Sequence, residues 1–416
     1  MILGAGPAGI AAGLSLGSRA LVLEREAGPG GLSCSVELEG AVFDLGGHSF
    51  HTPHPEVRQL VQESLELFEQ QRDARCFSHS SLIRYPFQKH FRDLSDAAVV
   101  DECAAGLQAA RPRPNAAHFL DYLEGRFGAG MARHFMLPYN RKLWGQDLMR
   151  LAADWVGERV AAPEGVQETF DETGGKRKPL QPETRVAYPA RGGFGEIMMA
   201  LARRLPLVRY GDGVASVDPR ARTVRTEAGE AHRYQTLLST LPLPALLRLC
   251  DAPEELRRAV DSLEYLSLKV VLLVIDHPVD TEIQRIYCAD DTLPAHKIAL
   301  NHNSSDYLRG LPRHGIMAEV SCAQGALPLD RELTAATIAG LERMGILRSA
   351  AEVVAWRVLE AKYAYPVPTH HRDGVVARAR AWLRERNIEI VGRFGEWAYI
   401  NADEAMHRGL RLGQSL

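Results

Sequence analysis

The glycines at positions 4, 6 and 9 have a spacing with clear chemical meaning. They lie between Ile2-Leu3, which would end a buried strand, and an apolar run over residues 10–16, which would form the next helix. Glycines at this spacing allow a tight turn, let the backbone approach a pyrophosphate and let the helix pack closely on the sheet. The pyrophosphate would face the helix N-terminus, where free N–H groups and the helix dipole favour negative charge.

An acidic residue follows at the distance expected for the ribose of such a ligand. Residues 21–23 read as a second apolar strand, and Glu24 comes directly after it, about twenty residues beyond Gly4. A carboxylate in this position accepts a hydrogen bond from a ribose 2′-OH and disfavours a 2′-phosphate. A GxGxxG pattern alone can be a simple turn, but the second strand and Glu24 make a dinucleotide site the stronger interpretation.

Two further glycine segments favour a flavin over a nicotinamide. Residues 28–33 read Gly-Pro-Gly-Gly-Leu-Ser, and residues 43–48 end in Gly-Gly-His. These segments resemble FAD-dependent amine oxidases, protoporphyrinogen oxidases and UDP-galactopyranose mutases. In those families the adenine half of FAD lies on the first motif and the Gly-Gly segment abuts the isoalloxazine ring. His48 is therefore a catalytic candidate; the alternative is a loop residue bonded to a neighbouring carbonyl.

Composition limits the class of protein. The chain has 416 residues, of which 46% are hydrophobic and 24% charged, and its formal net charge is −3. This length allows two connected domains, and the charge balance predicts neither nucleic acid nor a membrane surface as a partner. The six cysteines lack metal-ligand spacing, so we expect no metal site and a reducing compartment. With no signal peptide or long apolar run, we expect a soluble, cytoplasmic protein.

The segments between these motifs predict the framework that positions them. Residues 55–71 carry apolar side chains at helical spacing, and residues 95–165 read as mainly helical. Residues 164–183 are polar and basic, which predicts an exposed loop, either simply solvated or closing over an anionic ligand. We therefore expect a helical substrate domain inserted in the cofactor-binding fold.

The last part of the chain predicts a second approach to the cofactor. Val214 begins an apolar strand, and in two-dinucleotide-fold flavoproteins the valine of such a strand contacts the adenine through its backbone. Residues 388–391 form another strand, followed by the glycine-flanked Arg393 and by Asn401 at the start of a helix. This arrangement predicts an anion site at a helix N-terminus, so both ends of the chain would close on one cofactor.

Six stretches occur in the order found in UDP-galactopyranose mutases and resemble the eukaryotic-type branch most. They are residues 85–88, 135–144, 155–163, 188–195, 365–369 and 392–395. The resemblance runs from Gly4 to about Gly409, and the Trp-Val-Gly-Glu-Arg-Val-Ala-Ala-Pro stretch at 155–163 is its most specific part.

The fold class that follows is α/β, with a Rossmann-like FAD domain of the two-dinucleotide-binding type, an inserted helical domain and a substrate-domain β-sheet. The expected segments are 1–90 in the FAD-binding part with a substrate-pocket strand, 91–185 in the helical substrate domain, 186–245 back in the FAD-binding domain, 246–375 in the substrate-domain sheet and helices, and 376–416 in the C-terminal FAD-binding segment.

The resemblance implies an enzyme that uses flavin without net redox chemistry. Reduced FAD would attack the anomeric carbon of a nucleotide sugar through N5, so that the sugar ring opens and recloses between pyranose and furanose forms. NADPH or NADH is a candidate reductant. A small-molecule nucleotide sugar is the implied partner, and no oligomeric state is predicted.

Carried over position by position, the resemblance assigns three groups of residues. The catalytic candidates are His48, Arg159 and Lys297. The cofactor-binding candidates are Gly4, Gly6, Pro7, Ala8, Gly9, Glu24, Arg25, Gly30, Gly31, Leu32, Gly46, Gly47, His48, Val214, Gly392, Arg393, Asn401, Asp403 and Ala405. The substrate-binding candidates are Tyr85, Gln88, Phe135, Asn140, Trp144, Arg159, Lys297, Tyr365 and Tyr399. The alternatives are a salt-bridged surface position for Arg159 and a core position for Trp144.

Two departures from the family pattern keep another function open. The family carries an arginine that binds the diphosphate where this chain has Lys297, and a tyrosine where it has Ser304. Lysine keeps the charge but loses the planar fork that matches two phosphate oxygens. A lysine near a flavin could instead accept a proton during oxidation, so an FAD-dependent oxidoreductase is the second hypothesis. A flavin-binding protein without activity is the third.

Overall fold

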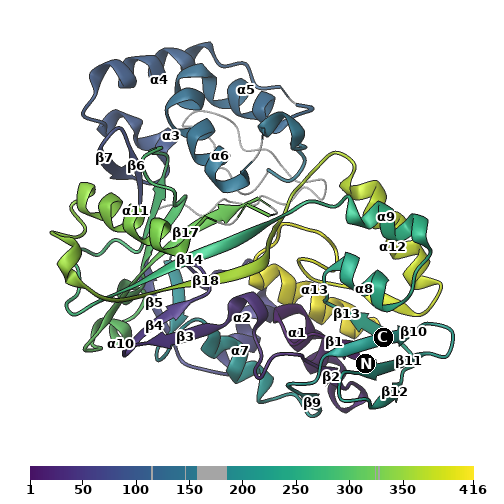
Figure 1. Cartoon of the computed structure of the whole chain (residues 1–416). Coiled ribbons are helices and arrows are strands. Elements are labelled where there is room, and N and C mark those ends of the chain that lie inside the picture. Colours follow the sequence, from purple (N-terminus) through teal and green to yellow (C-terminus); the bar gives the residue numbers. More distant parts are fainter. Residues whose placement is uncertain (114–115, 146, 157–184, 324, 327) are drawn as a thin grey trace.

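A five-stranded parallel sheet brings together segments from the whole length of the chain (Figure 1). The computed structural model describes residues 1–113, 116–145, 147–156, 185–323, 325–326 and 328–416. The strands, in their order across the sheet, are β19 (Ile388–Ile390), β13 (Leu237–Ser239), β1 (Ile2–Leu3), β2 (Val22–Leu23) and β9 (Val208–Arg209). The sheet is short, and its three central strands are apolar except for the buried Ser239, which fits burial on both faces.

Helices cover both faces of this sheet, and successive residues of β1 face opposite ways. Ile2 packs with one group of helices and Leu3 with the other. The first group is α1 (Pro7–Leu16), α7 (Gly195–Ala202) and α13 (Ala402–Gln414). The second group is α8 (Leu243–Leu249), α9 (Glu254–Asp261) and α12 (Arg372–Arg384). A small antiparallel sheet of β10 (Val214–Asp218), β11 (Thr223–Thr226) and β12 (Ala231–Arg233) lies beside them.

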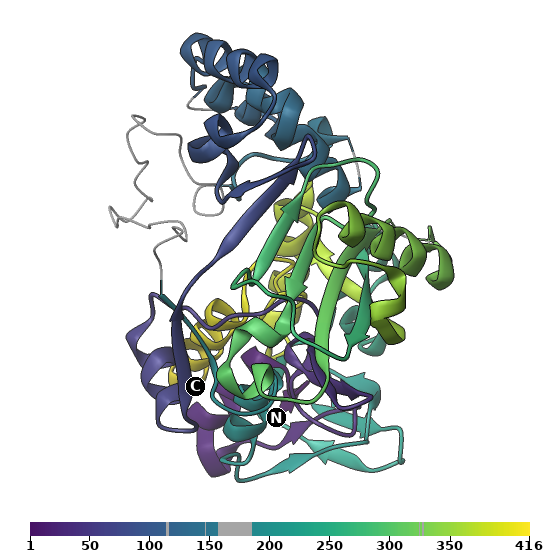
Figure 2. The same ribbon diagram turned by 90° about the vertical axis from the view of Figure 1, so that its left-hand side faces the viewer.

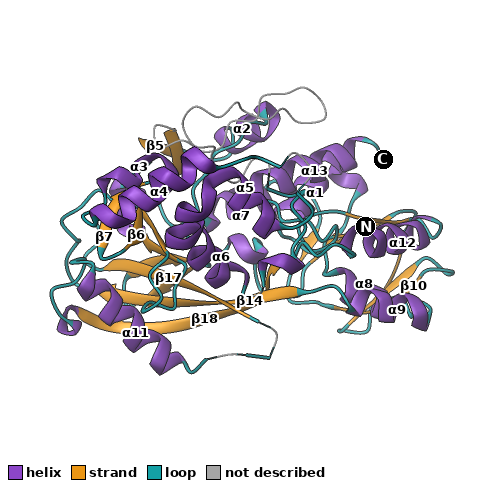
Figure 3. Cartoon of the chain, turned by 90° about the horizontal axis from the view of Figure 1, so that it is seen from above, coloured by secondary structure: helices purple, strands orange, loops and turns teal. Residues whose placement is uncertain are grey.

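A larger mixed sheet of seven strands forms the middle of the molecule (Figures 1 and 3). Its strands, in order, are β18 (Val353–Pro366), β14 (Tyr265–Ile275), β17 (His314–Cys322), β16 (Lys297–Leu300), β15 (Arg285–Cys288), β6 (Ala74–Ser78) and β7 (Ser81–Arg84). Helix α11 (Asp330–Arg343) packs on one face through Leu333 and Leu341. Two strand pairs complete the β structure: β3 (Ser35–Leu38) with β4 (Ala41–Asp44), and β5 (Leu67–Gln71) with β8 (Arg185–Pro189).

A helical region stands over one end of the large sheet (Figure 2). It contains α3 (Phe87–His90), α4 (Ala97–Ala109), α5 (Phe119–Met131) and α6 (Leu137–Trp144), with a π-helical turn over residues 132–136. Asp96 caps α4 by accepting hydrogen bonds from the Ala98 and Val99 amides. A Cβ on Gly130 would overlap the Glu102 carbonyl oxygen, so glycine is what lets α5 lie directly against α4.

The α/β fold class predicted from the sequence is confirmed, whereas one expected helix is wrong. Residues 55–71 divide into α2 (Pro55–Gln62) and strand β5, which pairs with β8 more than a hundred residues away. Apolar spacing cannot distinguish a long helix from a short helix followed by a strand when the strand's partner is distant. The expected segment boundaries remain predictions, and residues 164–183 lie outside the described residues. Among the described helices, none is both long enough and apolar enough to cross a bilayer.

The buried imidazole of His302 makes the stability of the fold depend on pH. His302 is 2% exposed, and burial, with His314 nearby, lowers its pKa from 6.5 to about 4. In the unfolded chain, His302 therefore binds a proton as the pH falls through about 6.5, whereas in the folded chain it binds one only near pH 4. We expect the free energy of unfolding to fall as the pH is lowered across this interval, by up to ~3 kcal/mol from this group.

Chemical denaturation at pH values from 4 to 7 measures this loss. The variant His302→Gln should flatten the dependence in that interval, because glutamine does not titrate. Equal slopes for the variant and the parent protein would contradict the assignment.

Candidate functional site

A single cavity of about 2160 Å³ connects the parallel sheet with the large sheet and the helical region. Its walls include the turn between β1 and α1, residues 47–54, most of residues 24–35, and most of residues 392–408 from the other end of the chain. Beyond these, the cavity reaches strands β15 and β16 and helix α6. The same cavity is therefore lined by residues of the glycine-rich segments and by residues expected to bind substrate.

The end of the cavity beside α1 fits a diphosphate and a ribose. Gly6 lines the cavity at the N-terminus of α1, and nothing lies within 4 Å of the place where a Cβ would be. Gly9 instead serves the turn, since a Cβ there would overlap the carbonyl oxygen of Gly4. Glu24 lines the cavity and accepts hydrogen bonds from the Ala5 amide at 2.6 Å and the Glu26 amide at 2.9 Å. The open space, the helix N-terminus and this fixed carboxylate match a dinucleotide.

Residues from the end of the chain form the opposite wall. The five residues of this segment that the sequence analysis assigned to the cofactor all line the cavity. They are Gly392, Arg393, Asn401, Asp403 and Ala405. The Arg393 guanidinium lies over two aromatic rings that also line it, 5.3 Å from Tyr365 and 5.1 Å from Tyr399. Helix α13 begins just after Asn401, so its N-terminus opens toward the same space.

The turn formed by Gly46, Gly47 and His48 rests on a buried carboxylate that the sequence analysis did not identify. Glu319 is 2% exposed, and its Oε1 accepts a hydrogen bond from the Gly47 amide at 2.6 Å. The ammonium of Lys297 lies 2.8 Å from the same oxygen. Although burial opposes ionisation, Lys297 holds the pKa of Glu319 at about 2. The carboxylate is therefore charged at neutral pH.

Strand register explains why these groups meet. Tyr287, Lys297 and Glu319 lie opposite one another on β15, β16 and β17, so their side chains share one face of the sheet. Arg285 lies two residues before Tyr287, on the same face, and donates to the carbonyl oxygen of His48. No local motif could have revealed the group, because β16 and β17 approach only in the folded sheet.

His48 is neutral in this environment. Burial, assisted by Lys297, lowers its pKa to about 4, and its Nδ1 lies 2.9 Å from the Gly46 carbonyl oxygen. The ring stacks on Phe194 with centroids 4.8 Å apart. His48 thus lines the cavity and also makes the neighbouring-carbonyl contact that was its alternative interpretation.

A second group missed from the sequence is Arg72, a buried arginine between β5 and β6. It is 7% exposed, lines the cavity and donates from Nη2 to the Tyr287 hydroxyl at 2.6 Å. Its guanidinium carbon lies 4.9 Å from the centroid of the Tyr85 ring. Its Nη1 has no hydrogen-bond partner, and among the described residues no carboxylate forms an ion pair with it.

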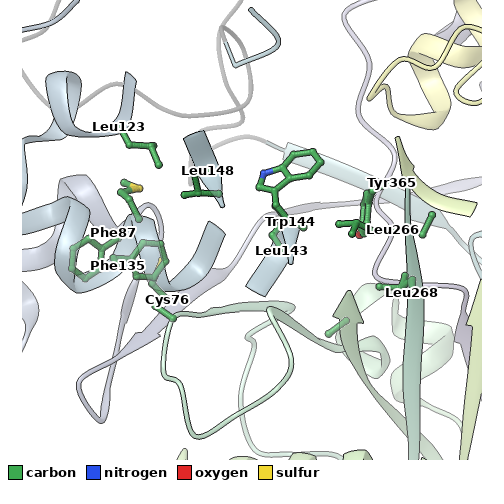
Figure 4. Close-up of a cluster of buried hydrophobic side chains, with 14 of the residues drawn as sticks. Cys76, Phe87, Leu123, Phe135, Leu143, Trp144, Leu148, Leu266, Leu268 and Tyr365 are labelled. Carbon is green, nitrogen blue, oxygen red and sulfur yellow. The ribbon is translucent and has the colours of Figure 1, made fainter. Parts of the chain in front are cut away.

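The remaining expected substrate residues divide into three groups. Those that line the cavity are Tyr85, Gln88, Phe135, Asn140, Lys297, Tyr365 and Tyr399. Trp144, at the end of α6, is fully buried in the hydrophobic core that also contains Leu148 and Tyr365 (Figure 4). It does not line the cavity. Arg159 lies outside the described residues.

Some of the expected cofactor residues also lie away from the cavity wall. Those in the wall are Gly4, Gly6, Pro7, Ala8, Glu24, Arg25, Gly31, Leu32, Gly47 and His48. Those outside it are Gly9, Gly30, Gly46 and Val214. Ser304, which stands where the mutase pattern has a tyrosine, also lies outside the wall. Gly30 and Gly46 have positive φ values of 120° and 98°, so their backbone conformation explains glycine at these turns.

The parallel sheet with helices on both faces, the glycine turn and the shared cavity are the features of a dinucleotide-binding fold, and segments from both chain ends line that one cavity. The chain belongs to the family described as flavin containing amine oxidoreductase, which it matches over residues 7–316. Membership implies FAD as the cofactor, which agrees with the fit of residues around Gly6 and Glu24.

Three known proteins are similar to this chain. A crystal structure of reduced UDP-galactopyranose mutase matches with a TM-score of 0.89 and 26% identity, over 99% of this chain and 92% of that one. Putrescine oxidase bound to putrescine matches with a TM-score of 0.70 and 18% identity, over 100% and 97%, and shows the fold alone. A zeta-carotene-forming phytoene desaturase from Myxococcus xanthus is 28% identical over 313 residues, 64% of this chain, and this chain spans 58% of its length.

The different roles of two glycines lead to a prediction about folding and cofactor binding. In Gly9→Ala the new methyl group overlaps the Gly4 carbonyl, so the turn must distort. We expect the protein without FAD to lose about 2 kcal/mol of stability, the usual cost of overpacking, and to bind FAD poorly.

Gly6→Ala is the matched comparison, because its methyl group would occupy open cavity space. It should leave the unfolding of the FAD-free protein unchanged and weaken FAD binding alone. Thermal unfolding and titration with FAD measure both effects. Normal stability and FAD affinity in Gly9→Ala would show that the turn does not depend on this contact.

Proposed function

We propose that the chain is a flavin-dependent nucleotide-sugar mutase, similar to UDP-galactopyranose mutase, that interconverts pyranose and furanose forms of its substrate. Two kinds of observation support this function. The structural match to a mutase covers nearly the whole of both chains. Seven of the residues that resemble mutase substrate contacts line one cavity with the expected cofactor residues.

The observation that carries the proposal is the buried guanidinium of Arg72. A charged group out of water is costly unless a partner of opposite charge or several acceptors surround it. Arg72 lines the cavity and has the Tyr287 hydroxyl and the Tyr85 ring as neighbours, and its buried Nη1 has no acceptor. An anionic ligand in the cavity would compensate the charge of this guanidinium, whose planar shape suits phosphate oxygens.

The residues around Arg72 suit the rest of a nucleotide. Tyr85 and Tyr287 lie with ring centroids 4.9 Å apart, and Phe135 stacks on Tyr139 with centroids 5.6 Å apart. All four line the cavity. Aromatic rings offer a surface on which a flat base can stack. Arg72 would therefore hold the diphosphate while aromatic rings hold the base.

The proposed reaction assigns distinct roles to the residues of this chain. Gly6 and Glu24 would hold the diphosphate and ribose of FAD, and the reduced flavin supplies the nucleophile for the anomeric carbon of the sugar. Arg72 would stabilise the negative charge that develops on the departing diphosphate. Lys297 is less suited to that task because its ammonium is already paired with Glu319 at 2.8 Å. His48, held neutral by burial, would offer a ring nitrogen to the sugar without adding charge.

An FAD-dependent oxidoreductase is the second candidate function. It is favoured by the phytoene desaturase relative and by Lys297, whose Nζ lies 3.5 Å from the carbonyl oxygen of Gly47. In its neutral form, a lysine beside that turn could accept a proton during substrate oxidation. Phytoene, however, is a hydrocarbon, and an apolar chain in this cavity would not compensate the charge of Arg72.

The direct test separates these two functions. The purified protein would be reduced with dithionite without oxygen and given UDP-galactopyranose or, separately, UDP-galactofuranose, with an oxidised sample as the control. We expect interconversion by chromatography only in the reduced sample. An intact, reduced flavin with no conversion across a panel of nucleotide hexoses would reject the mutase proposal. Flavin reduction by a substrate without added dithionite would support the oxidoreductase.

A variant of Arg72 tests the anion-binding role without requiring turnover. Arg72→Met should weaken UDP binding by roughly 10- to 100-fold, because a charged hydrogen bond is worth about 1.5–3 kcal/mol. FAD content should stay the same. Calorimetric titration with UDP measures the change.

Arg84→Met provides the matched control. Arg84 is an exposed arginine on β7 that forms an ion pair with Asp93, so its removal should not affect UDP affinity. Equal UDP affinity in Arg72→Met and the parent protein would exclude Arg72 from the diphosphate site.

A further inference from the structure

Three charged side chains hold the turn of Gly46, Gly47 and His48, and the proposed reaction does not use them as a set. We call Glu319, Lys297 and Arg285 the charged cradle. Glu319 accepts the Gly47 amide hydrogen, and Arg285 donates to the His48 carbonyl oxygen. Lys297 pairs with Glu319 and lies 3.5 Å from the Gly47 carbonyl oxygen.

The groups around the charged cradle add little charge of their own. His296 lies 3.7 Å from Glu319, and burial lowers its pKa to about 4, so it is neutral at pH 7. Tyr365 donates a hydrogen bond to the second Glu319 oxygen at 3.2 Å. His48 is likewise neutral. Lys297 is consequently balanced by Glu319 within a low-dielectric wall.

Arg285 has a separate counter-charge in Asp44. Burial raises the pKa of Asp44, although hydrogen bonds from Ser35, Tyr188 and the Phe194 amide, and the charge of Arg285, act to lower it. Removing the charge of Glu319 would therefore affect Lys297 first. Glu319 can therefore be changed while the charge of Asp44 still acts on Arg285.

Burying such ions calls for an explanation other than stability. An ion pair removed from water recovers at most part of its desolvation cost, and apolar residues of similar volume are often as stable or more so. Here the carboxylate makes contacts that an apolar residue could not, since it fixes one peptide N–H and one ammonium at the cavity wall. The free-energy cost of burying these ions has an explanation if the position and charge of the Gly47 peptide and of Lys297 affect the bound ligand.

We propose that Glu319 is a positioning residue for the flavin: it fixes the Gly47 peptide and cancels the charge of Lys297, so that the balance between these two residues sets the reduction potential of the bound cofactor. This inference rests on flavin binding and holds for either of the two reactions proposed above. Reduced flavin carries more negative charge than oxidised flavin near neutral pH, so an uncompensated cation nearby stabilises the reduced form and an uncompensated anion destabilises it.

The charge balance gives the two single variants opposite signs. Glu319→Gln keeps an oxygen that can accept the Gly47 amide hydrogen but leaves Lys297 uncompensated, so the midpoint potential should become more positive. Lys297→Met leaves Glu319 uncompensated, so the potential should become more negative. The double variant should return close to the parent value. Lys297→Arg keeps the charge and should shift the potential little.

The experiment is an anaerobic reductive titration of the full-length protein with bound FAD, in the presence of a reference dye, together with the flavin absorbance spectrum. Glu282→Gln is the matched control, since Glu282 is an exposed carboxylate paired with Arg309 and removed from the turn. It should leave the potential unchanged. A general loss of structure would instead release FAD or move both single variants in the same direction.

The possible outcomes are distinct. Opposite shifts of the single variants with cancellation in the double variant support the proposal. Shifts in the same direction, or no shift while FAD remains bound, overturn it. If Glu319→Gln fails to fold, an unchanged potential in Lys297→Met still overturns it and a negative shift supports it. Failure of the mutase assay leaves these potentials measurable, whereas a parent protein that binds no FAD overturns the cofactor assignment and this inference together.

Discussion

The contact between Gly9 and the carbonyl oxygen of Gly4 determines where helix α1 leaves the parallel sheet. A side chain at Gly9 would push the helix away, and its first N–H groups would no longer face the cavity. Helix α13 packs on α1 in the same way, since a Cβ at Gly409 would overlap the carbonyl oxygen of Ala8. These two glycine contacts bring Asn401, from the other end of the chain, to the wall that Gly6 also lines. The shape of the cavity thus depends on missing side chains.

Charge is distributed differently at the two ends of this cavity. Beside α1, backbone amides and a helix dipole offer partial charges that can bind a diphosphate without any buried cation. At the large sheet, full charges are buried, and their partners decide what they can do. Lys297 has Glu319 as a partner, while Arg72 interacts with the side chains of Tyr85 and Tyr287 and with no carboxylate among the described residues. Of the two cations, Arg72 therefore has the greater need for an anionic ligand.

The parts of this site that could be predicted from the sequence are those formed by residues that are close together along the chain. The Gly4–Gly9 turn and Glu24 follow from spacing, because strand, turn and helix are consecutive. Glu319 and Arg72 could not be predicted, since their partners come from other strands and their own flanking residues carry no signal. Trp144 shows a different limit: an aromatic residue in a pocket motif can fill the adjacent core, because both positions are apolar and buried.

The lysine at position 297 is best understood together with its partner. An ammonium is a compact charge, so it can sit between the Glu319 carboxylate and the Gly47 carbonyl, where the planar fork of an arginine would demand more acceptors. Once paired in this way, Lys297 contributes little net charge toward a diphosphate. The mutases that this chain resembles carry an arginine at this position. In the function proposed above, Arg72 instead recognises the anion, and Lys297 acts on the turn of Gly46, Gly47 and His48.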